Sequence, residues 1–179
     1  LKLDYVKNLI ADWARRGLKS VILIGGGEPT LSPYFEEAVG FLKGLSLQVG
    51  IASNGSNMKK IENVCHLLGR SDWVRLSLDV GREGTFQEVH RPKVGITLAE
   101  ILAGVKRIRR QNASVQLGYS FLIISDDKRG NNVFLPNNIK EIVDAASLAK
   151  ENGFNYFSLK PFINPEGFRE TGISQNNLQ

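Results

Sequence analysis

The chain has 179 residues, of which 42% are hydrophobic and 23% are charged, so its composition excludes overall disorder and allows one globular domain with a buried core. The formal charge of +5 does not indicate a nucleic-acid partner, because the clearest basic cluster, residues 106–110, lies on a helical pattern that leaves the cations in solvent. No apolar run approaches the roughly 18 residues of a membrane span and the start lacks signal-peptide features, so we expect a cytoplasmic protein without a membrane partner.

Helical and extended patterns alternate along the chain. An amphipathic helix is predicted over residues 3–16 and ends at Gly17. Strands rich in Val, Ile, Leu, Phe or Tyr are predicted at residues 20–24, 48–52, 73–79, 115–124 and 156–161, with helices between them at residues 33–45, 57–68, 97–111 and 137–151. The strands begin about 25 to 41 residues apart, which is typical of strand, crossover helix, strand units in a parallel sheet.

The alternation of side chains within the strands distinguishes two kinds of parallel sheet. Val74 and Leu76 share one face, while Arg75, Ser77 and Asp79 share the other. A doubly wound sheet is usually apolar on both faces, whereas a barrel can present polar side chains to a solvated interior. We therefore predict an α/β fold, an incomplete parallel (β/α)6 TIM-like barrel with about five strands. The barrel domain is expected over residues 1–163, and residues 164–179 are expected to form a polar C-terminal tail or the start of a linker.

The strongest local motif is Gly-Gly-Gly-Glu-Pro-Thr at residues 25–30, where a strand has ended and no helix has begun. Parallel α/β proteins bind ligands at such positions. Gly26 and Gly27 allow the main chain to approach a ligand closely, and Glu28 adds an acceptor suited to an ammonium group. A phosphate loop would place Gly-Lys-Ser or Gly-Lys-Thr here, and this chain does not. The alternative is that the glycines only make a tight turn and that Glu28 caps the next helix.

This motif resembles the methionine-binding motif of the radical S-adenosylmethionine (SAM) superfamily. Further stretches resemble family features in the same order: Ser-Asn-Gly at residues 53–55, Arg-Leu-Ser-Leu-Asp at 75–79, Tyr-Ser-Phe-Leu-Ile at 119–123 and Ser-Leu-Lys-Pro at 158–161. The similarity runs from residue 3 to about residue 162. The first motif is specific, and each later one is weak alone.

The resemblance implies a binding site for SAM. The cofactor-binding residues that it predicts are Gly26, Gly27, Glu28, Pro29, Ser53, Asn54, Ser77, Asp79, Ile123, Lys160 and Pro161. The turn at Glu28 suits the ammonium group, Ser77 and Asp79 suit the ribose hydroxyls, and the backbone near Ile123 and Pro161 suits adenine. Lys160, like Arg75, suits the cofactor carboxylate or a substrate anion.

A structural role remains the alternative for several of these residues. Ser77 can be a satisfied barrel hydroxyl, and Asp79 can cap a turn before Gly81. Asn-Gly is a common turn by itself, and Lys160 and Arg75 can be ion-paired at the barrel mouth. No catalytic residue or metal ligand is predicted. His90 is expected in a loop with a structural or solvent-exposed role.

Cys65 is the only cysteine, so these residues alone cannot hold an iron–sulfur cluster by three thiolates. It falls in an apolar helical pattern and is predicted to lie in the core. The family holds its [4Fe-4S] cluster with Cys-x-x-x-Cys-x-x-Cys on a loop that would precede Leu1. We interpret the start without Met and the polar end over residues 171–177 as the ends of a piece of a longer protein. The cluster is then expected only in the full-length parent.

In such a parent, the resemblance implies that the reduced cluster cleaves SAM to a 5′-deoxyadenosyl radical, which abstracts hydrogen from an unknown substrate. An electron donor for the cluster is the implied partner, and the fragment alone is expected to be inactive. Three alternatives stay open: a degenerate family member without a cluster, a non-enzymatic α/β domain that binds a nucleotide or phosphate, and an interaction domain without a ligand.

Overall fold

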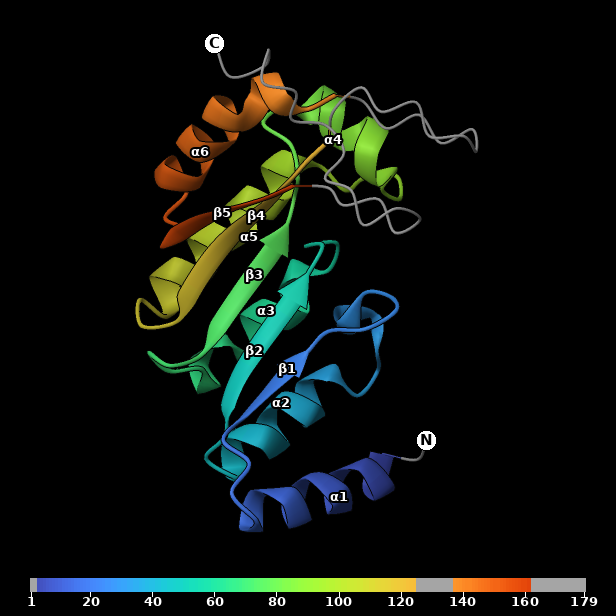
Figure 1. Cartoon of the computed structure of the whole chain (residues 1–179), viewed down its shortest axis with the longest axis vertical. Helices are drawn as coiled ribbons and strands as arrows, with labels where there is room; N and C mark the ends of the chain where they lie inside the picture. Colours follow the sequence, from blue (N-terminus) through green and yellow to red (C-terminus); the bar gives the residue numbers. More distant parts are fainter. Residues whose placement is uncertain (1–2, 125–136, 162–179) are drawn as a thin grey trace.

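The computed structural model describes residues 3–124 and 137–161 of the chain (Figure 1). In chain order its elements are α1 (Leu3–Arg15), β1 (Ser20–Leu23), η1 (Pro29–Leu31), α2 (Phe35–Gly44), β2 (Gln48–Ser53), α3 (Met58–Val64), η2 (Cys65–Leu67), β3 (Trp73–Ser77), α4 (Glu83–His90), α5 (Leu98–Gln111), β4 (Gln116–Ile123), η3 (Ile139–Glu141), α6 (Ile142–Glu151) and β5 (Tyr156–Pro161). None of the described helices combines the length and the apolar character that a bilayer crossing requires. The tail expected over residues 164–179 lies outside the described residues.

The five strands form one parallel sheet whose spatial order equals their order in the sequence, β1-β2-β3-β4-β5. Each connection therefore moves one strand further in the same direction, and right-handed crossovers put the connecting helices on one face. Figure 1 shows α3 and α5 on the same side of the sheet, where α3 packs against both α2 and α5. A doubly wound sheet would reverse direction and cover both faces. The predicted α/β fold of an incomplete TIM-like barrel is confirmed.

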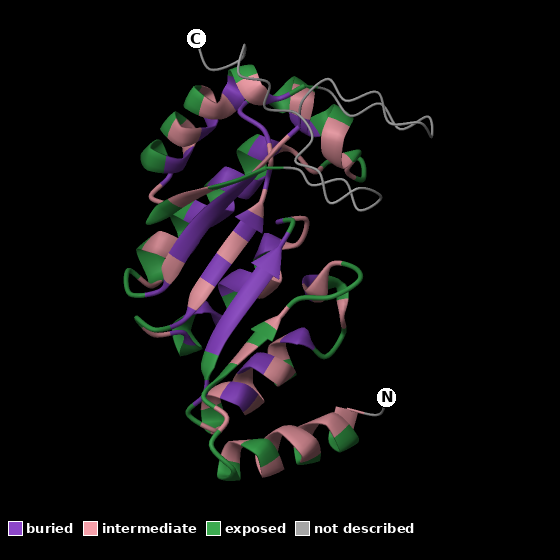
Figure 2. Cartoon of the chain, in the orientation of Figure 1, coloured by how far each residue is buried: buried purple, intermediate pink, exposed green. Residues whose placement is uncertain are grey.

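The core lies between the sheet and these helices. Val74 and Leu76 of β3 are 1% and 2% exposed. Arg75, which lies between them, and Ser77, which follows them, are only half-buried, as the alternation predicts. Figure 2 shows this buried band running through the central strands. Its most deeply buried strand residues are Val49, Ile51, Val74, Leu76, Leu117, Tyr119 and Phe121.

The opposite side of the sheet, which we call the open face, is formed by Ile22, Gly50, Trp73, Arg75, Ser77, Gly118, Ser120, Tyr156, Ser158 and Lys160. Two large rings on this face lie across glycines of the neighbouring strand. A Cβ atom on Gly50 would come within 2.3 Å of the Trp73 ring, and one on Gly118 within 2.1 Å of the Tyr156 ring. Glycine is therefore required at both positions, because any side chain would collide with an aromatic ring.

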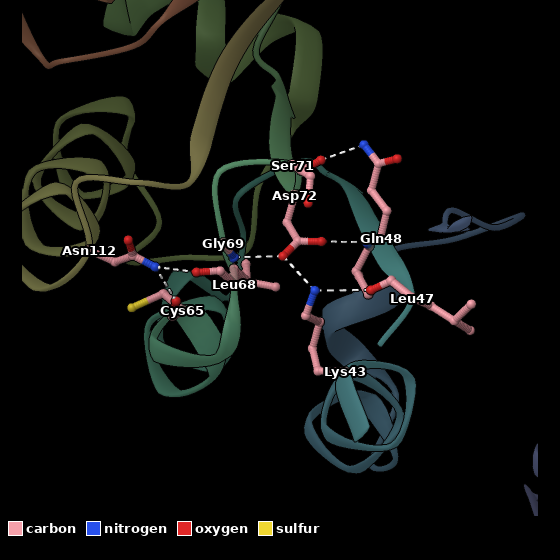
Figure 3. Close-up of polar contacts among 10 residues, drawn as sticks. Lys43, Leu47, Gln48, Cys65, Leu68, Gly69, Ser71, Asp72 and Asn112 are labelled. Atoms are coloured by element: carbon pink, nitrogen blue, oxygen red, sulfur yellow. Dashed lines mark hydrogen bonds and ion pairs between the residues drawn. The ribbon is translucent and has the colours of Figure 1, made fainter. Parts of the chain in front are cut away.

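Asp72 ties the amino edge of the sheet together (Figure 3). Its side chain is 0% exposed, and its carboxylate accepts hydrogen bonds from Val49 N at 2.6 Å and Gly69 N at 2.6 Å. Lys43 Nζ lies 2.7 Å from the same carboxylate and also donates to Leu47 O at 3.0 Å. This one carboxylate thus joins α2, β2 and the loop that enters β3.

The basic cluster lies on α5, whose buried side contains Ile101, Val105 and Ile108. Arg107 forms an ion pair with Glu62 at 2.7 Å. Arg109 donates to main-chain carbonyls at Gly153, Ala113 and Val115. These two arginines therefore stabilise the fold.

α4 is the helix that the sequence analysis did not predict. Its eight residues contain only two large apolar side chains, Phe86 and Val89, so its apolar periodicity is too short to detect. The expectation that His90 lies in a loop was wrong, because His90 is the last residue of α4. Its Nε2 atom lies 2.6 Å from Leu78 O, and Arg91 ends the helix in a left-handed conformation with φ 45°.

Candidate functional site

The glycine turn after β1 is exposed, and neither packing nor backbone conformation within the chain requires glycine at positions 26 and 27. A Cβ atom on Gly26 or Gly27 would meet no atom within 4 Å, and neither glycine has the left-handed φ that favours glycine. In contrast, Gly55 in the next turn has φ 78°, and a Cβ there would lie 2.8 Å from Ile101. Backbone conformation and packing therefore account for glycine at position 55. At Gly26 and Gly27 the space beside the main chain is empty.

Glu28 fastens this turn to the carboxyl end of β2. Its Oε1 accepts hydrogen bonds from Thr30 N at 3.0 Å, Thr30 Oγ1 at 2.7 Å and Ser53 Oγ at 2.8 Å. Its Oε2 accepts one from Asn54 N at 2.7 Å. A carboxylate has about four lone-pair positions, two on each oxygen, so Oε2 keeps capacity for a further donor. Glu28 is thus both the cap of η1, which begins at Pro29, and a half-buried acceptor at the edge of the sheet.

Ser53 and Asn54 hold different positions relative to this edge. Ser53 is 3% exposed, and its Oγ donates to Glu28 while it accepts from Gly55 N at 3.0 Å. Its side chain therefore lies behind Glu28 and positions it. Asn54 is exposed, and its Oδ1 accepts from Ser56 N at 2.9 Å.

Asp79 follows β3 in a left-handed conformation with φ 57°, which Asp tolerates better than most residues. Its Oδ1 accepts a hydrogen bond from Leu122 N at 2.7 Å and so joins the ends of β3 and β4. Burial raises the pKa of the Asp79 carboxyl group, and the Leu122 hydrogen bond and the charges of His90 and Lys160 oppose this rise only in part. Folding therefore disfavours the ionised form of the Asp79 carboxyl group, because it removes the carboxylate from water.

Replacing Asp79 with asparagine is expected to raise the thermal stability at neutral pH. Asparagine also tolerates a left-handed φ and keeps an oxygen for Leu122 N, but it has no charge to desolvate. Because folding raises the pKa of Asp79, its ionisation weakens the folded state as the pH rises above the ordinary value of 3.8. Melting curves from pH 3 to pH 8 should show the stability gain of the variant shrinking toward zero at the acid end. A gain that is constant with pH would contradict this account.

The carboxyl ends of β4 and β5 complete the edge. Ile123 pairs with Pro161, and Leu122 pairs with Lys160, which is exposed. Ser77, at the end of β3, pairs with Ser120 of β4. Because all five strands are parallel, every predicted site residue lies at the same edge of one sheet, where barrel enzymes bind ligands.

Two contributors to this edge were missed in the sequence. Thr30 donates hydrogen bonds to Glu28 from both its amide and its hydroxyl. A capping pattern around Pro29 is the sequence signal that indicates this role of Thr30. Asn138 is 0% exposed, and its Nδ2 donates to Asp79 O and Leu122 O, both at 2.7 Å. No local signal identifies Asn138, because its partners lie in distant parts of the chain.

The described residues contain no group of three or more His, Cys, Asp or Glu side chains that could hold a metal ion. The single cysteine, Cys65, is 0% exposed, as predicted, and its Sγ lies 3.1 Å from Gln111 Oε1. Burial raises the pKa of its thiol. The residues of this chain therefore do not fit an iron–sulfur cluster held by three thiolates.

A sequence profile of the radical SAM superfamily matches residues 1–129, which is well over half of the chain. The chain belongs to the radical SAM superfamily. This membership supports SAM-dependent radical chemistry in general, with SAM and a [4Fe-4S] cluster as the cofactors that the family implies.

Two curated relatives carry the same name, S-adenosylmethionine-dependent nucleotide dehydratase. The one from Flammeovirga pacifica is 31% identical over 94 residues, which cover 51% of this chain and 31% of the relative. The one from Thermoplasmatales archaeon (strain ISO4-H5) is 32% identical over 74 residues, which cover 41% of this chain and 26% of the relative. The matched segment therefore spans less than a third of the length of either relative.

Two solved structures share the fold. SuiB from Streptococcus suis has a TM-score of 0.68 at 14% identity, covering 94% of this chain and 35% of its own. TYW1 with a lysine-pyruvate adduct bound has a TM-score of 0.61 at 17% identity, covering 96% of this chain and 55% of its own. At such identities the likeness shows the barrel-type architecture alone.

Proposed function

We propose that the carboxyl edge of this sheet binds SAM for reductive cleavage and hydrogen abstraction from a substrate. The observation that carries the proposal is the pair Gly26 and Gly27, which is exposed, unstrained and free of neighbours beside the fixed carboxylate of Glu28. Main-chain carbonyls at the turn and Glu28 Oε2 are acceptors for the ammonium group. Pro29 starts η1 directly after this acceptor and keeps the turn short.

The ribose and adenine are assigned to the ends of β3, β4 and β5. Ser77 and the second carboxylate oxygen of Asp79 are acceptors for the ribose hydroxyls, and the backbone near Ile123 and Pro161 binds adenine. Asn54 lies on the cofactor side of the second turn, and Ser53 acts through Glu28. Lys160 adds a positive charge to the same edge.

When bound, SAM supplies the radical that removes hydrogen from the substrate. The residues of this chain would orient the cofactor along the sheet edge. Electron delivery requires cluster ligands that the single cysteine cannot provide, together with an electron donor. We assign the barrel domain to residues 1–163, residues 164–179 to a polar tail or linker, and the protein to the cytoplasm.

The relatives named as nucleotide dehydratases suggest a nucleotide as the substrate. Part of this chain is 31% identical to one of them. A reaction assay of the full-length parent with a panel of nucleoside triphosphates tests this substrate class. Turnover of other substrates with no turnover of nucleotides would exclude it.

Replacing Gly27 with valine is expected to weaken SAM binding by about tenfold, or 1.4 kcal/mol, without unfolding the chain. The new side chain meets no protein atom within 4 Å at its Cβ, so its branches occupy the space left for the cofactor. Isothermal titration calorimetry with SAM measures the affinity. Gly40→Ala on α2 is the matched control, because a Cβ there also meets nothing and alanine favours the helix by about 1 kcal/mol.

Equal SAM affinity for wild-type chain, Gly27→Val and Gly40→Ala would contradict the proposed position of the cofactor. Tighter binding of inorganic phosphate than of SAM, lost in Gly27→Val, would instead favour a non-enzymatic phosphate-binding turn. Wild-type affinity for SAM in a full-length parent without cluster cysteines would identify a degenerate member of the family.

A further inference from the structure

Four side chains hold the segment 78–81, which follows β3 and which we call the clamped segment. Each of its residues has one main-chain group within 2.5 to 2.7 Å of a side-chain atom, and the side chains are, in order, His90, Asn138, Tyr119 and Glu141. They come from α4, from β4, and from η3 together with the residue before it. Tyr119 and Asn138 are 0% exposed, and Glu141 is 6% exposed. Contacts from distant parts of the chain therefore fix this segment.

Asn138 takes the place of sheet hydrogen bonds where one strand of a pair has ended. β3 ends before Asp79, whereas β4 continues past Leu122. Asn138 Nδ2 uses its two hydrogens on Asp79 O and Leu122 O, both at 2.7 Å, and its Oδ1 accepts from Ile124 N at 2.7 Å. Leu122 N in turn donates to Asp79 Oδ1 at 2.7 Å. One buried amide therefore ties the residue after β3 to the end of β4.

The same contacts hold Asp79 in a conformation that most residues avoid. Its φ of 57° is left-handed, and such a conformation persists where the surrounding structure over-determines it. Asn138 fixes the carbonyl of Asp79, and Tyr119 donates to the next carbonyl, Val80 O, at 2.5 Å. Among the described residues, Leu122 N is the only donor to the Asp79 carboxylate, so Oδ2 keeps its acceptor positions. The carboxylate is therefore held in place before any ligand arrives.

We propose that Asn138 and Tyr119 are positioning residues, which act through Asp79 and set its carboxylate for the ribose hydroxyls before SAM binds. The inference rests on the proposed function for the identity of the ligand. An acceptor that is already in place avoids part of the ordering cost of binding. Both residues therefore contribute to the affinity for the nucleoside half of SAM, and neither affects the methionine half, which is assigned to the turn at Glu28.

Calorimetric titration of the 179-residue chain with 5′-deoxyadenosine and with methionine tests the two halves separately. Asn138→Ala is expected to lower the 5′-deoxyadenosine affinity about fivefold and to leave the methionine affinity unchanged. Asn112→Ala is the matched control. Asn112 Nδ2 also donates to two main-chain carbonyls at 2.7 Å, Cys65 O and Leu68 O, but Asn112 precedes β4 and so lies toward the amino edge (Figure 3). This control should change neither affinity.

An Asp79→Gly background separates positioning from general stabilisation. Glycine accepts the left-handed φ but has no carboxylate. Because Asn138 acts through Asp79, adding Asn138→Ala to Asp79→Gly should lower the 5′-deoxyadenosine affinity no further. A loss of equal size in both backgrounds, a parallel loss of methionine affinity, or unchanged 5′-deoxyadenosine affinity in a folded Asn138→Ala chain would overturn the proposal.

Tyr119→Phe keeps the test decisive if Asn138→Ala does not fold. Phenylalanine retains the ring that packs against Phe154 and Phe157, and it removes only the hydroxyl that donates to Val80 O. The variant is expected to lower the 5′-deoxyadenosine affinity about threefold, and only when Asp79 is present. Unchanged 5′-deoxyadenosine affinity in Tyr119→Phe would contradict the positioning role.

The pKa of Asp79 reports on positioning without any ligand. Burial raises this pKa, so a loosened segment should bring it closer to the ordinary value of 3.8. Carboxyl NMR titration of Asn138→Ala measures the change, and Asn112→Ala should keep the wild-type pKa. An unchanged pKa in Asn138→Ala would overturn this inference alone. A wild-type chain that binds neither SAM nor 5′-deoxyadenosine would overturn the proposed function and this inference with it.

Discussion

Replacing Asp72 with alanine is expected to lower the free energy of unfolding by about 3 to 5 kcal/mol. The carboxylate is 0% exposed and accepts hydrogen bonds from Val49 N and Gly69 N as well as the ion pair from Lys43. Its removal leaves the amides of Val49 and Gly69 without their acceptor, and it leaves the 20% exposed ammonium group of Lys43 with Leu47 O alone. Chemical denaturation curves measure the change.

Asp12→Ala is the control for this prediction. Asp12 lies on α1, where it pairs with Arg16 at 2.8 Å, but its side chain is 39% exposed. Exposed pairs contribute at most about 1 kcal/mol, so Asp12→Ala should change the stability by no more than that. Equal losses for the two variants would show that Asp72 does not organise the amino edge of the sheet. SAM binding at the opposite edge should survive Asp72→Ala at temperatures where the chain remains folded.

Replacing Glu28 with alanine is expected to weaken SAM binding about a hundredfold and to lower the stability by about 1 to 3 kcal/mol. The binding loss has two causes: the acceptor for the ammonium group is removed, and the glycine turn loses its attachment to Ser53 and Asn54. The stability loss follows because the hydrogen-bond donors of Thr30, Ser53 and Asn54 then lack their acceptor. Calorimetry with SAM and thermal melting measure the two effects separately.

Glu37→Ala serves as the control, because Glu37 is a 53% exposed residue of α2 with a surface ion pair to Lys7. It should change neither the SAM affinity nor, by more than about 1 kcal/mol, the stability. A Glu28→Ala chain that melts earlier but binds SAM as tightly as wild type would show that Glu28 is only a structural cap. The cofactor assignment would then lose its main acceptor.

Most of the fold could be predicted from the sequence, because each strand is a short apolar run whose period of two is visible locally. All five predicted strands are present, and the ends of each differ from the prediction by two residues or fewer. The exception among the helices, α4, has only two large apolar residues, Phe86 and Val89, and so almost no hydrophobic pattern. The location of the candidate site was also predictable, because a glycine-rich turn after a parallel strand lies at the carboxyl edge wherever the sheet is built.

The partners of individual side chains could not be predicted. Glu28 and Ser53 are 25 residues apart in the sequence, and their hydrogen bond depends on how β1 and β2 are aligned. The alternation showed that Arg75 and Ser77 share a face, but it did not show that Ser120 and Ser158 align with Ser77. Register between strands is set by packing across the whole sheet, which no local pattern contains.

The sequence by itself determined the order and type of the elements, the turn at Gly26 to Glu28 and the single buried cysteine, because apolar periodicity and backbone freedom are local properties. Only the tertiary structure decided that Glu28 is fastened to the second strand, that Asn138 closes the end of β3 onto β4, and that Ser77, Ser120 and Ser158 align on neighbouring strands. Those relations join residues that are 25 to 59 positions apart or lie on different strands, and a hydrogen bond forms only when folding brings donor and acceptor within about 3 Å.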